Sequence, residues 1–316
     1  MLAELYPQLC QNIPEDDLAL FGLPIRADIP FWLTIDANAF PAVLLPASKD
    51  DHRPDIELRV VEALFSRSCT IMSEGSQQHV GYFSLIRLKD NDPDVVRLFL
   101  KIVEERFCVP DYQYDNAAIA TNIQQIAALF SQIDDNTRDL IGLWGELFVI
   151  SQARDVNEAV KCWCRRRTAK YDFVAESFVL DVKATLKTAP IHRFSLEQLR
   201  PKGEFDAYIA SLCLVEVPNG RTVGEIVDGI SERITDQDLR YQFLTQCLAK
   251  GGRDLYRSGL ALQTYPDVNT ATLFDVKVIP APQIEIGDPI ENVRFDINLS
   301  GISPLSTETK KMIFQF

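Results

Sequence analysis

Two aspartates and a lysine occur close together near the middle of the chain. Asp172 adjoins a short apolar run, and Asp181 and Lys183 alternate with apolar residues in the segment 179–185. Alternation with a period of two predicts a strand that carries Asp181 and Lys183 on one face. The short segment 175–178 predicts a hairpin turn, which would bring Asp172 beside Asp181. Two neighbouring carboxylates with little hydration need a cation or a proton, so we expect Lys183, a metal ion or both to neutralise them.

A third carboxylate, Glu146, lies upstream in the segment 141–150, whose pattern predicts a helix. Apolar residues lie one turn before and one turn after Glu146, so its carboxylate falls on a mostly apolar surface. Gly142 and Gly145 would allow another element to approach this helix closely. Buried acidic groups are rare unless they are paired or bind a metal ion.

The chain contains, in order, Glu146, Asp172, Asp181 and Lys183. In residue type, order and local context these four residues resemble the motif of the PD-(D/E)XK nuclease superfamily. Tyr171 stands where the motif has proline, a position at which the superfamily varies. Segments 192–199 and 292–299 also resemble a bacterial family of PD-(D/E)XK motif proteins associated with restriction and phage-defence gene clusters. The resemblance covers roughly residues 136–299.

The resemblance implies a Mg²⁺-dependent endodeoxyribonuclease, in which Mn²⁺ could substitute. Glu146, Asp172, Asp181 and Lys183 would be catalytic, and Glu146, Asp172, Asp181 and Val182 would be the metal-binding positions. Carboxylate oxygens suit such hard cations. The cation would lower the pKa of a bound water, and Lys183 would orient that water or stabilise the developing charge.

The resemblance further implies double-stranded DNA as substrate, cleavage that leaves a 5′-phosphate, and a homodimer, since cutting both strands commonly uses two sites. It implies a role in restriction of foreign or phage DNA, alongside methyltransferase or ATPase partner subunits.

Several residues near the motif are candidates for DNA contact. The segment 161–170 carries five positive charges directly before Asp172; it is either a solvated loop or a phosphate-binding segment. We expect His192 with Arg193 to contact DNA and Gln198 to face the site. The complete set of predicted DNA-binding residues is Arg165, Arg166, Arg167, Lys170, His192, Arg193 and Gln198.

Other interpretations of these residues remain open. The aspartates and Lys183 could be charges on the exposed face of a half-buried hairpin, and Glu146 could form a helix-edge salt bridge. The chain could also be a catalytically silent DNA-binding or assembly subunit of a defence complex that keeps the nuclease fold. A zinc site at Cys162 and Cys164 is disfavoured, because no second closely spaced Cys or Cys/His pair completes four ligands.

Composition indicates a globular protein with a net charge of −13 and a pI of about 4.8. Such a charge argues against attraction of DNA to the whole surface, but it allows a local basic groove. Seven scattered cysteines do not form a disulfide framework. We find no apolar run of membrane-spanning length and no signal-peptide pattern, and we expect a cytoplasmic protein.

The predicted fold class is α/β (α+β overall). It comprises a restriction-endonuclease-like mixed central sheet flanked by helices, an N-terminal α+β domain and a C-terminal sheet extension. We place the domain boundary at 109–111, giving domains 1–110 and 111–316. A helix over 116–133 is expected to form an αα-hairpin with the Glu146 helix. We also predict a short helix over 16–21 and a turn at 218–220.

Overall fold

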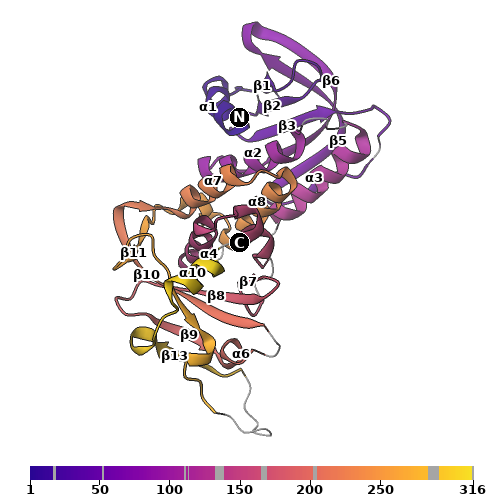
Figure 1. The fold of residues 1–316 in the computed structure, drawn as a ribbon. Helices are drawn as coiled ribbons and strands as arrows, with labels where there is room; N and C mark the ends of the chain where they lie inside the picture. Colours follow the sequence, from indigo (N-terminus) through magenta and orange to yellow (C-terminus); the bar gives the residue numbers. More distant parts are fainter. Residues whose placement is uncertain are drawn as a thin grey trace. The chain divides into compact units, whose positions relative to one another are not determined.

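The computed structural model describes residues 1–16, 19–51, 53–109, 112, 114–131, 139–164, 169–201, 205–283 and 292–314. The chain divides into two compact units, Met1–Asn136 and Thr137–Phe316 (Figure 1). This boundary lies later than the predicted one, because helix α3 (Asn116–Ser131) packs against strands of the first unit. The prediction that the helix over 116–133 forms an αα-hairpin with the Glu146 helix places it in the second domain instead.

The first unit is built on a sheet with strand order β1-β2-β3-β6-β5-β4. Because β1 also pairs in parallel with β5, five of the strands form a closed ring around an apolar core that includes Trp32, Ile71 and Phe83. The strands are β1 (Leu20–Pro24), β2 (Trp32–Ile35), β3 (Pro41–Pro46), β4 (Ile56–Glu57), β5 (Val61–Ser73) and β6 (Gln77–Leu88).

Three helices cover this sheet. Helix α1 (Leu2–Leu9) contacts β1 and β2, α3 contacts β5 and β6, and α2 (Pro93–Phe107) contacts both helices. The predicted helix over 16–21 is wrong at its end, because Leu20 begins β1 and pairs with β5; residues 17–18 lie outside the described part of the chain.

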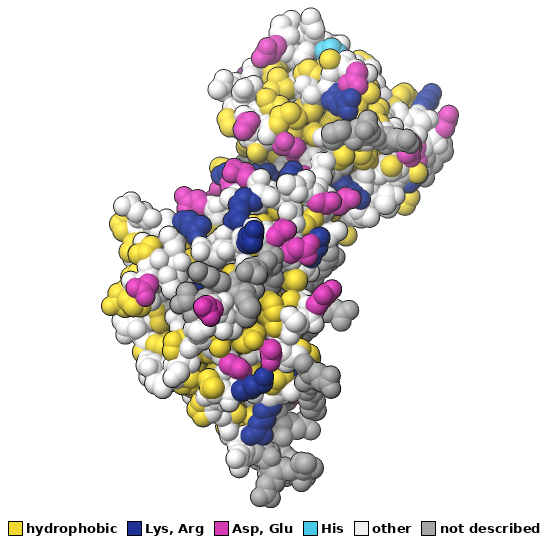
Figure 2. All heavy atoms as spheres, in the orientation of Figure 1, with side chains coloured by type: hydrophobic (Ala, Val, Ile, Leu, Met, Phe, Trp, Pro, Cys, Tyr) yellow, Lys and Arg dark blue, Asp and Glu magenta, His cyan; other side chains and the backbone are white. Residues whose placement is uncertain are grey.

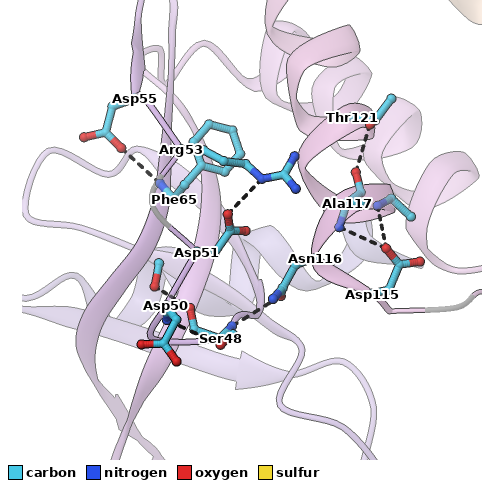
Figure 3. A network of polar contacts seen from close by, with 12 residues as sticks. Ser48, Asp50, Asp51, Arg53, Asp55, Phe65, Asp115, Asn116, Ala117 and Thr121 are labelled. Atoms are coloured by element: carbon cyan, nitrogen blue, oxygen red, sulfur yellow. Dashed lines mark hydrogen bonds and ion pairs between the residues drawn. The ribbon is translucent and has the colours of Figure 1, made fainter.

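Polar contacts fix the start of α3 within the first unit (Figure 3). Oδ1 of Asp115 accepts hydrogen bonds from the backbone N–H groups of Ala117 and Ala118, each across 2.9 Å. Oδ1 of Asn116 accepts another from the backbone of Ser48, which follows β3, across 3.2 Å. The capping satisfies N–H groups that have no partner within the helix.

The second unit contains a mixed sheet of order β11-β10-β8-β7, with β12 also paired to β10. Strands β8 and β10 are parallel, and the other pairs are antiparallel. The strands are β7 (Phe173–Val174), β8 (Phe178–Thr185), β10 (Asp206–Arg221), β11 (Leu262–Tyr265) and β12 (Thr272–Asp275). The mixed sheet flanked by helices confirms the predicted fold class.

Helices cover one face of this sheet. Helix α4 packs on β8 and contacts α5, α7 and α8. Shorter helices α9 and α10 follow later in the chain. The bounds are α4 (Leu140–Gln152), α5 (Val156–Cys162), α7 (Val223–Arg233), α8 (Gln237–Gly251), α9 (Asp254–Arg257) and α10 (Thr307–Ile313).

The other face of the sheet carries a core that includes Val179, Phe194 and Ile209. A separate two-stranded ribbon, β9 (Ile191–Ser195) with β13 (Arg294–Asn298), and the short helix α6 (Leu196–Leu199) contribute to it. Strands β11 and β12 therefore extend the central sheet, whereas β13 pairs with β9.

The predicted turn at 218–220 falls within β10, which extends to Arg221. Glu216 and Arg221 both pair with Leu262, so the residues between them leave the register with β11 where the turn is predicted.

No helix in the described ranges combines the length and the apolar character that crossing a bilayer requires. On the face shown in Figure 2, Lys and Arg side chains lie among Asp and Glu side chains on both units.

Candidate active site

Glu146 is positioned by the close packing of α4 on β8. Asp139 caps α4 by accepting a hydrogen bond from the backbone N–H of Gly142 across 2.8 Å. Gly145 lies against the sheet: a Cβ at this position would be 3.0 Å from Cβ of Ala184 and 3.2 Å from Cγ1 of Val182. The missing side chain therefore allows the helix to approach β8, which brings the next residue, Glu146, to the edge of the sheet.

Asp172 lies at the point where the short strand β7 begins. Its backbone N–H donates to the carbonyl of Leu180, and its Oδ2 accepts a hydrogen bond from the backbone N–H of Val182 across 2.7 Å. The side chain thus satisfies a β8 donor that β7, with only two residues, does not reach. The hairpin places Asp172 beside the Asp181–Lys183 segment.

Asp181 is buried, with 3% of its surface exposed. Oδ1 accepts a hydrogen bond from Nε2 of Gln198 on α6 across 3.1 Å. Oδ2 lies 2.9 Å from Nζ of Lys183 in an ion pair, but it has no hydrogen bond of regular geometry with the described residues. Lys183 is 20% exposed, and its ammonium also lies 5.7 Å from the ring centroid of Phe194.

Two residues that the sequence did not single out hold Glu146. Nζ of Lys250, in the last turn of α8, forms an ion pair with Oε2 of Glu146, and Nε1 of Trp163 donates a hydrogen bond to the same oxygen. The Lys250 ammonium also lies 4.8 Å from the centroid of the Trp163 ring. A lysine before Gly251-Gly252 is ordinary at a helix end, so no local pattern marks Lys250 as part of a site.

The three carboxyl groups influence one another electrostatically. Burial raises the pKa of Glu146 to about 7; the charge of Asp172 adds to the rise, and Lys250 opposes it. Burial also raises the pKa of Asp181 to about 7, opposed by Lys183 and increased by Asp172. Burial raises the pKa of Asp172, while the Val182 N–H and then Lys250 and Lys183 favour its ionised form. Asp172 is therefore the carboxylate on which both lysines act.

The predicted DNA-contact residues have different environments. His192 is buried, and its Nε2 lies 2.7 Å from the Ser211 hydroxyl; burial, with Lys183 and Lys187, lowers its pKa to about 4. It is therefore neutral near pH 7 and brings no positive charge to a phosphate. Arg193 is exposed and lies 3.5 Å from Asp296 in an ion pair.

The remaining predicted contacts divide into described and undescribed residues. Gln198 donates hydrogen bonds to the carboxylate of Asp181 and to the carbonyl of Lys170, the latter across 3.3 Å. The Lys170 ammonium lies 5.0 Å from the ring centroid of Tyr171. Arg165, Arg166 and Arg167 lie outside the described residues.

A hollow of about 460 Å³ lies beside Lys183. Lys187, His192 and Arg193 also line it, together with the N-terminal turn of α4 at Asp139 and Gly142. Its lining combines the cationic side chains of Lys183, Lys187 and Arg193 with the carboxylates of Asp139 and Asp296, and Asp296 pairs with Arg193.

The donor chemistry of the site fits a hard divalent cation, although lysines neutralise its acids in this structure. Asp172 and Asp181 offer carboxylate oxygens, and the buried Oδ2 of Asp181 lacks a regular hydrogen bond. Within the described ranges, no three His, Cys, Asp or Glu side chains are grouped as the ligands of a metal ion. Asp172 and Asp181 are the residues that would hold one.

The fold and the family match define the class of protein. The mixed sheet flanked by helices is a restriction-endonuclease-like fold, in which Glu146 lies on α4, Asp172 directly before β7, and Asp181 and Lys183 on β8. Residues 17–300 match the DUF4420 family model, whose description reads "Putative PD-(D/E)XK family member". The chain belongs to this family, and the match includes most of the first unit. No curated protein and no solved structure matches the chain.

Proposed function

We propose that this protein is a divalent-metal-dependent endonuclease that hydrolyses phosphodiester bonds in double-stranded DNA. One observation carries the proposal: Glu146, Asp172 and Asp181 gather at one sheet edge, close enough to perturb one another's pKa values, with Lys183 beside them. Burying Asp181 and partly burying Glu146 and Asp172 costs stability, because each acid loses hydration and repels the others. Membership of a family with a nuclease-like fold supports metal binding and catalysis as the reason for this costly arrangement.

Asp172 and Asp181 would hold Mg²⁺, with Mn²⁺ able to replace it. The bound ion would supply a water of lowered pKa and would polarise the phosphodiester. The partly exposed ammonium of Lys183, between Asp181 and the hollow, would orient the attacking water and stabilise charge on the phosphate. Gln198 would keep the Asp181 carboxylate in place.

The hollow beside Lys183 would receive the DNA backbone. Lys187 and Arg193 would contact phosphates there. Because the overall charge is strongly negative, binding would depend on this local surface rather than on general attraction to the protein.

Restriction of foreign DNA would be the biological role, with a homodimer cutting both strands and methyltransferase or ATPase subunits as partners. The family match supports this role because many proteins that restrict foreign DNA are nucleases, and the family description indicates a nuclease-like protein.

The test is cleavage of unmethylated plasmid and phage DNA in Mg²⁺ or Mn²⁺ by the wild type and by Asp181→Asn and Lys183→Met. Each substitution should lower the cleavage rate at least ~10²-fold. Lys277→Met is the matched control, because Lys277 is exposed and pairs with Asp206 outside the proposed site. Equal cutting by all four proteins would place the activity elsewhere. A wild type that neither binds Mn²⁺ nor cuts would favour a silent assembly subunit.

A further inference from the structure

Lys250 and Trp163 restrain Glu146 through a single oxygen atom. The lysine belongs to α8 and the tryptophan follows α5, yet both contact Oε2 of Glu146 on α4. Lys250 is 11% exposed and Glu146 is 14% exposed, so solvent does little to weaken the pair. Three separate parts of the chain thus cooperate to keep an ammonium group on this carboxylate.

The site contains two such pairs, and both of their lysines act on a third acid. Lys250 pairs with Glu146, and Lys183 pairs with Asp181 across 2.9 Å. Asp172 is the acid on which both ammonium groups act electrostatically, Lys250 more strongly than Lys183.

The charge of this constellation fits one divalent ion better than two. With every group ionised, three carboxylates and two ammonium groups leave one excess negative charge. One divalent ion together with one phosphodiester would bring the total to zero. A second divalent ion would leave two uncompensated positive charges in a poorly solvated place, which is costly.

We propose that Lys250 takes the place of a second divalent cation, so that the site binds a single ion on Asp172 and Asp181. Glu146 is held by Lys250 and Trp163 and is not a metal ligand, which makes Lys250 a positioning residue. This inference rests on the proposed function, since it describes how the same site would be loaded with metal.

The experiment is to count bound Mn²⁺ per chain by electron paramagnetic resonance, which reports free Mn²⁺, and to measure its affinity by calorimetry. No DNA is present. The wild type should bind one ion. Lys250→Met keeps the apolar length of the side chain but frees Glu146 and Asp172, and it should bind a second, weaker ion. Lys277→Met is the matched control and should bind one.

The double variant Lys250→Met with Glu146→Gln guards against misfolding, because it leaves neither member of the buried pair without its partner. It should return to one ion, with an affinity within about threefold of wild type, because the metal ligands are unchanged. Circular dichroism checks that each variant is folded.

Two bound ions in the wild type, or a single ion in a folded Lys250→Met variant, would overturn the inference. A loss of affinity of tenfold or more in the double variant, the size typical of a metal-site residue, would also overturn it, because Glu146 would then be a ligand. A wild type that binds no Mn²⁺ contradicts the proposed function itself, and that outcome is distinct from the others.

Discussion

Gln198 donates a hydrogen bond to Oδ1 of Asp181 across 3.1 Å, although the two residues belong to α6 and β8. The other atom of the amide, Oε1, accepts a hydrogen bond from the backbone N–H of Ser195, the residue that caps α6. The backbone N–H of Ser195 therefore fixes the amide, and the amide fixes one oxygen of a buried acid. The second oxygen of Asp181 remains available to Lys183 or to a metal ion.

Replacing Gln198 by Leu should weaken Mn²⁺ binding about tenfold, because outer contacts orient the carboxylates that hold a metal ion. The control is Ser195→Ala, which removes the capping hydroxyl and leaves the Gln198 amide. It should cost about 1 kcal/mol of the free energy of unfolding and leave the Mn²⁺ affinity unchanged. Calorimetry and urea denaturation measure the two quantities. Equal Mn²⁺ affinities in both variants would show that Gln198 does not orient Asp181.

Gly145 should tolerate Ala but not Val. Alanine gains about 1 kcal/mol of helix propensity, which offsets its tight contacts with Ala184 and Val182. Valine should reduce the free energy of unfolding by about 3 kcal/mol, because it would force α4 away from β8. Gly229 on α7 is the matched control: nothing lies within 4 Å of a Cβ there, so Gly229→Ala should stabilise the protein. Urea denaturation tests all three, and a harmless Gly145→Val would contradict the packing argument.

The low pKa of His192 should make the protein less stable in acid. Burial is its main cause, and Lys183 and Lys187 add to it, so the pKa falls from 6.5 to about 4. Between these values the unfolded chain binds a proton that the folded chain does not, so stability decreases as the pH falls. The raised pKa values of Glu146 and Asp181 act in the opposite direction over the same range.

Comparison with His192→Gln isolates the histidine contribution, because both proteins retain the two acids. Between pH 7.5 and 5, the wild type should lose about 2 kcal/mol more than the variant, as measured by urea denaturation in EDTA. Parallel pH profiles for the two proteins would mean that His192 titrates normally in the folded state.

Lys187 should contribute one phosphate contact to DNA binding. In an Asp181→Asn background, which prevents cutting, Lys187→Ala should weaken binding and lower the slope of log K against log salt concentration by about 1. Lys277→Ala, at an exposed lysine outside the hollow, should leave the slope unchanged. Fluorescence anisotropy at several salt concentrations provides the measurement. Identical salt slopes for the two lysine variants would show that Lys187, and with it the hollow, does not contact the DNA backbone.

The sequence by itself determined the local features of this protein. Alternation over 179–185 predicted β8, and the short segment after Val174 predicted its hairpin with β7. These features depend on neighbouring residues, so periodicity and capping chemistry are sufficient to find them. The family resemblance added the order of Glu146, Asp172, Asp181 and Lys183, and the family match confirms its class.

Only the tertiary structure decided which distant residues share the site. Lys250 is far from Glu146 in sequence, and its place in an ordinary helix end gives no local signal. His192 seemed a phosphate contact beside Arg193, but strand alternation and burial direct it to Ser211 instead. Helix α3 joins the first unit because its apolar side packs on β5 and β6. Such contacts between residues distant in sequence depend on the packing of the whole unit, so local sequence patterns do not predict them.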